Sequence, residues 1–178
     1  MNEPRSPRSA ASVQGNAAAQ GSADKPPRRK PPTSMVVAIW AVRACFAFVF
    51  AVNVQCALGF TLMPEAYMGA YELAGVPGRV AAQGIGVAFL MWNCTYPLVI
   101  WKPQRHTTLA GVVLAQQVVG LIGESAIRAT LPGGHDLLAS SIDLFIAFDA
   151  VGLLLMGVSL AVFLFTRNLC SKRREIDS

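Results

Sequence analysis

The stretch from Thr107 to Leu131, TTLAGVVLAQQVVGLIGESAIRATL, combines the length and apolarity of a membrane span with several polar side chains. A transmembrane helix needs about 20 predominantly apolar residues, and this stretch exceeds that length. Gln117, Glu124 and Arg128 are spaced by seven and four residues, so they lie on one face of a helix. We therefore predict a membrane helix whose polar face is directed toward other helices.

Three further apolar segments have a similar length, at about residues 35–62, 80–101 and 138–165. Their continuous apolar runs indicate helices, because the strands of a membrane barrel alternate in polarity. The connections MPEAYMGAYELAGVPGR, KPQRH and PGGHD contain Pro or Gly, which commonly interrupt helices. The sequence predicts an all-α integral membrane protein, with an up-down bundle of four transmembrane helices over residues 35–166.

Composition and charge support this class of protein. The chain has 178 residues, of which 53% are hydrophobic and 14% charged, whereas globular domains carry about 25% charged residues. Basic residues concentrate in a Pro-, Ser- and Ala-rich tail at residues 1–34, predicted to be disordered, and in a second tail at residues 167–178. The segment KPPRRK (residues 25–30) either contacts anionic lipid or serves as a topology signal. Interleaved aromatics and a folded basic surface are lacking, so no nucleic-acid partner is expected.

The distribution of basic residues also predicts an orientation. Lys102 and Arg105 lie in the second connection, and both tails are basic, whereas the first and third connections are not. The positive-inside rule then places both termini and the second connection in the cytoplasm, for a multi-pass protein of the inner (plasma) membrane. Trp40 and Trp101 fall at the inner interface, where aromatic residues are enriched.

Polar residues of all four helices fall at similar depths in the outer half of this bundle. Glu124 and Arg128 are expected to pair along one helix, and Asp143 or Asp149 to neutralise Arg79 or Arg128. The cluster either forms an outward-facing cavity for a small polar or amphipathic ligand or fixes helix order through internal ion pairs. The candidate ligand-binding residues are Asn53, Gln55, Arg79, Gln83, Gln117, Glu124, Arg128, Asp143 and Asp149.

No motif for conventional catalysis is found, so we assign no catalytic residue, and an enzyme is the less favoured interpretation. The four cysteines form no CxxC pair, and His106 and His135 fall on opposite sides of the predicted membrane. No metal site or resident cofactor is therefore predicted. In the inner half, Arg43 is expected to extend toward the interface or to pair. Pro97 is expected to kink the second helix, with Thr95 or Asn93 bonding to the backbone carbonyls that the kink frees.

Arg43, the segment GFTLMPEAY (residues 59–67) and the segment LAGVPGRVAAQGIGVAFL (residues 73–90) resemble the DoxX-like group of small four-helix membrane proteins. The resemblance covers about residues 40–165. It implies a link to quinone-associated redox complexes, and quinone is the one cofactor that it suggests.

Three functions are therefore considered. The first and favoured one is a non-enzymatic accessory or scaffold subunit of a membrane complex, with a membrane-protein partner or as a homo-oligomer. The second is a carrier or receptor with an outward-facing polar cavity. The third is a component of a quinone-linked oxidoreductase.

Overall fold

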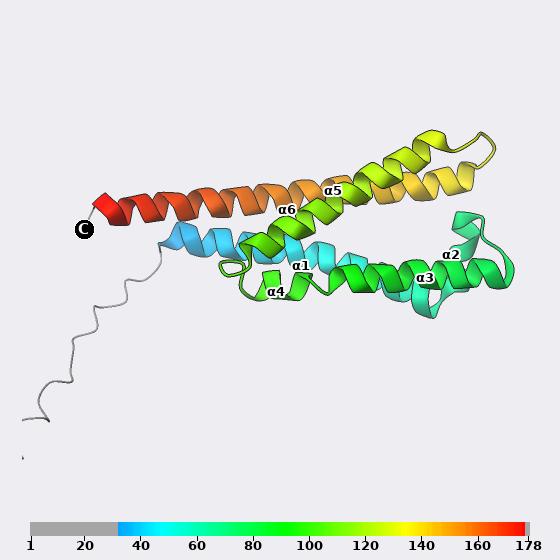
Figure 1. Ribbon diagram of the computed structural model, residues 1–178, viewed down its shortest axis with the longest axis horizontal. Helices are drawn as coiled ribbons and strands as arrows, with labels where there is room; N and C mark the ends of the chain where they lie inside the picture. Colours follow the sequence, from blue (N-terminus) through cyan, green and yellow to red (C-terminus); the bar gives the residue numbers. More distant parts are fainter. Residues whose placement is uncertain (1–31, 177–178) are drawn as a thin grey trace, which may run out of the picture. The chain divides into compact units, whose positions relative to one another are not determined.

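The computed structural model of the chain describes residues 32–176, and side chains as far as residue 173. The predicted tail, including KPPRRK, lies almost wholly outside these residues. Every regular element within them is helical (Figure 1). The helices are α1 (Thr33–Leu62), α2 (Pro64–Met68), the 3-10 helix η1 (Gly69–Tyr71), α3 (Gly75–Asn93), α4 (Tyr96–Trp101), α5 (Thr107–Thr130) and α6 (Asp136–Ile176).

Four helical stretches are long and apolar enough to cross a membrane, which confirms the four predicted segments. They are Thr33–Leu62, Gly75–Trp101, Thr107–Thr130 and Asp136–Arg173. The chain reverses direction between consecutive stretches (Figure 1). The long helix α1 packs against α3, α4 and α6, whereas α5 packs mainly against α6 and α4. Because α5 makes no extensive contact with α3, the bundle is less tightly closed on that side.

The helix bounds differ from the prediction at three places. The second stretch begins at Gly75 rather than at about Val80, because Pro77 lies in the first helical turn, where its missing N–H leaves no backbone bond unmade. The fourth helix continues to Ile176, since no Pro or Gly follows Phe165. The predicted span ends near Phe165 because the apolar residues end there, whereas the helix itself continues through the polar residues that follow. The first connection contains α2 and η1, which the sequence analysis did not predict.

The predicted kink near Pro97 is confirmed as a break between α3 and α4 at Cys94 and Thr95. Proline cannot donate the hydrogen bond that would continue the helix. Asn93 Nδ2 donates to the Phe89 carbonyl at 2.8 Å, and Thr95 Oγ1 donates to the Trp92 carbonyl at 3.2 Å.

An apolar core occupies the half of the bundle that contains the start of α1 and the end of α6. Phe46, Met156 and Phe163 are fully buried there, and Tyr96 lies where this core ends. The outward-facing surfaces carry large apolar side chains, such as Leu144, which is 71% exposed. In a bilayer these side chains contact lipid, and the buried polar side chains of Asn93 and Gln117 lie beyond the apolar core.

Candidate functional site

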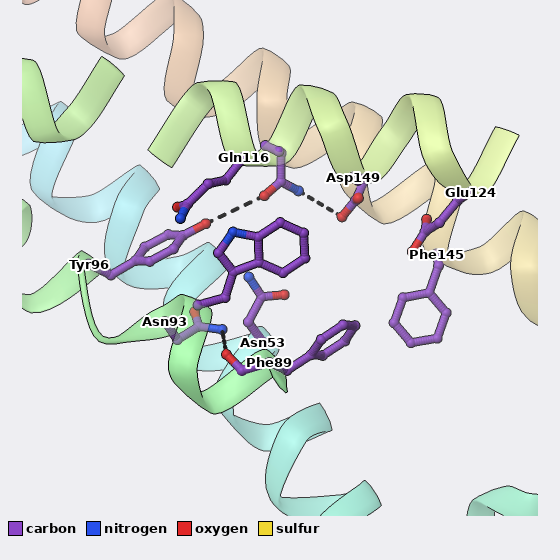
Figure 2. Close-up of a pocket in the computed structure, with 11 residues that line it drawn as sticks. Asn53, Phe89, Asn93, Tyr96, Gln116, Glu124, Phe145 and Asp149 are labelled. Carbon is purple, nitrogen blue, oxygen red and sulfur yellow. Dashed lines mark hydrogen bonds between the residues drawn. The ribbon is translucent and has the colours of Figure 1, made fainter. Parts of the chain in front are cut away.

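A polar cavity lies beyond the apolar core, with residues from α1, α3, α4, α5 and α6 around it. It has a volume of about 50 Å³ and is partly open to the surface. Figure 2 shows Phe89, Asn93 and Tyr96 on one side of this cavity and Gln116, Glu124 and Asp149 on the other. The lining residues are Asn53, Phe89, Trp92, Asn93, Tyr96, Gln116, Gln117, Gly120, Glu124, Phe145 and Asp149.

The side-chain amide of Gln117 forms hydrogen bonds with two other residues that line the cavity, Asp149 and Tyr96. Its Nε2 donates to Asp149 Oδ1 at 2.7 Å, a short hydrogen bond between α5 and α6. The Tyr96 hydroxyl donates to Gln117 Oε1 over 3.4 Å, which is long for such a bond. Gly120 gives the carboxylate its space, because a Cβ atom at this position would lie 2.8 Å from Asp149 Oδ2.

Three acceptor atoms around the same cavity are buried and have no hydrogen-bond partner among the described residues. They are Asn93 Oδ1, Gln116 Oε1 and Glu124 Oε2. Each buried acceptor without a partner costs about 1–3 kcal/mol. None of the lining residues is Lys, Arg or His, so Glu124 and Asp149 face no cationic side chain across the cavity. The arrangement therefore favours a group that donates hydrogen bonds and carries positive charge.

A second, largely apolar cavity adjoins the first and shares Phe89, Glu124 and Phe145 with it. Its other walls include Phe60 and Tyr71, whose ring centroids are 5.4 Å apart. The Phe89 and Phe145 rings meet edge to face at 6.1 Å. Burial raises the pKa of the Tyr71 phenol, so this ring is neutral at physiological pH. Glu124 thus lies at the junction of a polar cavity and an aromatic one.

Four of the nine sequence-predicted site residues meet in the polar cavity: Asn53, Gln117, Glu124 and Asp149. The other five lie elsewhere. Gln83 Nε2 donates to the Thr61 carbonyl at 3.3 Å, and Gln55 is exposed. Arg79, Arg128 and Asp143 form ion pairs outside the cavity.

Among the predicted ion pairs, the one between Asp143 and Arg128 is confirmed, whereas two others are wrong. Glu124 does not pair with Arg128, because the arginine extends to Asp143 of α6 at 2.8 Å. Arg79 pairs with Glu65 rather than with an aspartate of α6. Glu65 lies in α2, a helix that was not predicted within the first connection. The ion pair between Arg79 and Glu65 was therefore not predicted either.

Asn93, Tyr96 and Gln116 were not included among the predicted site residues. Asn93 was expected in the inner half, bonded to a backbone carbonyl of the kinked second helix. The spacing held a usable signal for part of the site, because Phe89 and Asn93 are separated by four residues and share one face of α3, whereas Tyr96 follows the break after Asn93.

No protein-family model, curated protein or solved structure matches this chain. The resemblance to the DoxX-like group therefore stays a prediction. Among the described residues, no group of three or more His, Cys, Asp and Glu side chains is arranged to hold a metal ion.

Proposed function

We propose that this protein is a membrane-embedded carrier or receptor for a small amphipathic organic cation, such as an aromatic amine in its ammonium form. The observation that carries the proposal is the set of unpartnered acceptors Asn93 Oδ1, Gln116 Oε1 and Glu124 Oε2 around one cavity. A primary ammonium group supplies three N–H donors and a charge complementary to the two carboxylates. Charge-assisted hydrogen bonds of this kind are the strong ones.

The adjoining aromatic cavity favours a ligand with an apolar or aromatic body. Phe60, Tyr71 and Phe89 present rings to that body, and a cation near a ring gains about 0.5–2 kcal/mol. The loose packing between α3 and α5 favours access from the bilayer, where amphipathic amines partition. With both termini in the cytoplasm, as the basic residues predict, the cavity opens toward the outer leaflet.

The two other functions gain less support from this geometry. A purely structural cluster would pair its polar groups with one another, as Arg128 and Asp143 do, whereas three cavity acceptors have no such partner. A quinone presents carbonyl oxygens, which accept hydrogen bonds, so it would leave these three acceptors without donors.

Calorimetric titration of the purified protein with 2-phenylethylammonium tests the proposal. Propylbenzene serves as the neutral analogue and phenylacetate as the anionic one. We expect saturable binding of the ammonium alone. Glu124→Gln and Asp149→Asn should each weaken binding by about 10- to 100-fold, since a hydrogen bond to a charged group is worth about 1.5–3 kcal/mol. Asp143→Asn is the matched control, because Asp143 lies outside the cavity, and it should bind like the parent. No binding of the ammonium, or equal binding of phenylacetate, would contradict the proposal.

A further inference from the structure

A second candidate site lies at the opposite end of the bundle, in an open groove between α1 and α4. Its walls include Trp40, Arg43, Ala44, Ala47, Pro97 and Trp101. The small side chains of Ala44 and Ala47 leave room along α1, and both tryptophans are largely exposed, at 61% and 64%. The groove is apolar except for the guanidinium of Arg43.

Arg43 contacts both tryptophans of this groove. Its Nη2 donates to the Trp101 carbonyl at 2.6 Å, and its guanidinium carbon lies 5.0 Å from the centre of the Trp40 ring. Its Nε is buried and has no hydrogen-bond partner among the described residues. No described acidic side chain forms an ion pair with it. The Arg43 charge is therefore not neutralised by a described acidic side chain, and four of its five N–H groups have no acceptor among the described residues.

The guanidinium also lies at the end of a stretch long and apolar enough to cross a membrane, because it bonds to the last residue of Gly75–Trp101. Trp101 is the last residue of α4, and Lys102 begins the connection to α5, with its Nζ 4.1 Å from the centre of the Trp101 ring. Tryptophans and basic residues gather at this depth in membrane proteins, where lipid phosphates also lie. A second cationic group is thus available beside the groove.

We propose that this groove binds one anionic phospholipid, with its phosphate at Arg43 and an acyl chain along Ala44 and Ala47. Arginine presents planar N–H donors that match phosphate oxygens. The uncompensated charge requires an anion, and the apolar walls require an acyl chain, so a lipid satisfies both. This site shares no residue with the cation cavity and does not depend on it.

Quenching of tryptophan fluorescence by brominated lipids tests this proposal directly. Trp40 and Trp101 border the groove, and Trp92→Phe removes the one other tryptophan of the chain. In nanodiscs of this variant, phosphatidylglycerol with brominated chains should quench at a lower mole fraction than brominated phosphatidylcholine. We expect a preference of about fivefold, the size that one basic residue near a membrane surface confers.

Substitution of the arginine gives the second arm of the test. Arg43→Gln should abolish the preference, whereas Arg79→Gln should retain it, because Arg79 pairs with Glu65 and does not border the groove. Arg43→Lys keeps the charge without the planar N–H group and should retain only part of it. Equal quenching by the two lipids in the Trp92→Phe protein would overturn the proposal, whether or not the Arg43 variants fold. Loss of the preference on adding millimolar glycerol phosphate would also overturn it, by assigning the site to a soluble anion.

Discussion

Gln117 is the residue on which the polar cavity depends most, because it joins α5 to α6 through Asp149. Gln117→Leu keeps the size of the side chain but removes the donor. We expect the free energy of unfolding to fall by about 1–3 kcal/mol, the cost of leaving a half-buried carboxylate oxygen without its partner. Denaturation in mixed detergent, followed by helical circular dichroism, measures the change. Tyr96→Phe removes only the 3.4 Å bond and should cost less than about 1 kcal/mol. Equal losses in the two variants would contradict this assignment.

Gly120 gives a prediction that separates the shape of the site from helix stability. A methyl group at Gly120 would lie 2.8 Å from Asp149 Oδ2, whereas one at Gly123 would meet no atom within 4 Å. Gly120→Ala should therefore displace the carboxylate, cost about 1–3 kcal/mol of stability and weaken binding of 2-phenylethylammonium. Gly123→Ala should be neutral or slightly stabilising, since alanine favours a helix over glycine by about 0.5–1 kcal/mol. Calorimetric titration and unfolding of both variants make the comparison. Identical behaviour would show that Asp149 does not limit the space beside Gly120.

At the scale of helices, the close approach of α1 and α3 depends on Gly86. A Cβ atom at this position would lie 2.7 Å from the Ala57 carbonyl oxygen and 2.9 Å from the Thr61 amide nitrogen, both of which are backbone atoms. Gly86→Ala should separate the two helices and destabilise the protein by about 1–3 kcal/mol. Gly84→Ala, at a position with open space on the same helix, should not. Thermal unfolding of both variants gives the comparison. An unchanged Gly86→Ala variant would mean that α1 and α3 are not tightly packed.

The four membrane-spanning helices could be predicted because apolarity and length are local properties of the chain. The helices of the first connection could not. Glu72 follows η1 in a left-handed conformation with φ 54°, and its carboxylate lies 2.5 Å from His135 Nδ1 in the connection before α6. That contact joins residues 63 positions apart, and no local pattern indicates it. The Arg128–Asp143 pair, in contrast, was among the predicted pairs, because both residues fall at a similar depth on neighbouring membrane helices.

At the scale of the whole molecule, the polar cavity results from an uneven arrangement of helices. The sequence indicated that Gln117 and Glu124 share one face of α5, and the structure places both around one cavity with Asp149 of α6. It could not indicate that α5 packs against α6 and α4 and only loosely against α3, because that depends on the packing of side chains between helices. The aromatic second cavity, between α1, η1, α3, α5 and α6, likewise depends on this packing.

The orientation of the bundle decides which side of the membrane each site serves. In a variant whose four cysteines are replaced by serine, single cysteines at Gly133 and Gln104 probe the third and second connections, and both positions are exposed. If both termini are cytoplasmic, Gly133→Cys should react with a membrane-impermeant maleimide in intact cells, and Gln104→Cys only after permeabilisation. The reverse pattern would place Lys102 and Arg105 outside, against the positive-inside rule. The cation cavity would then open toward the inner leaflet, and the groove at Arg43 would face the outer leaflet, where anionic lipid is scarcer.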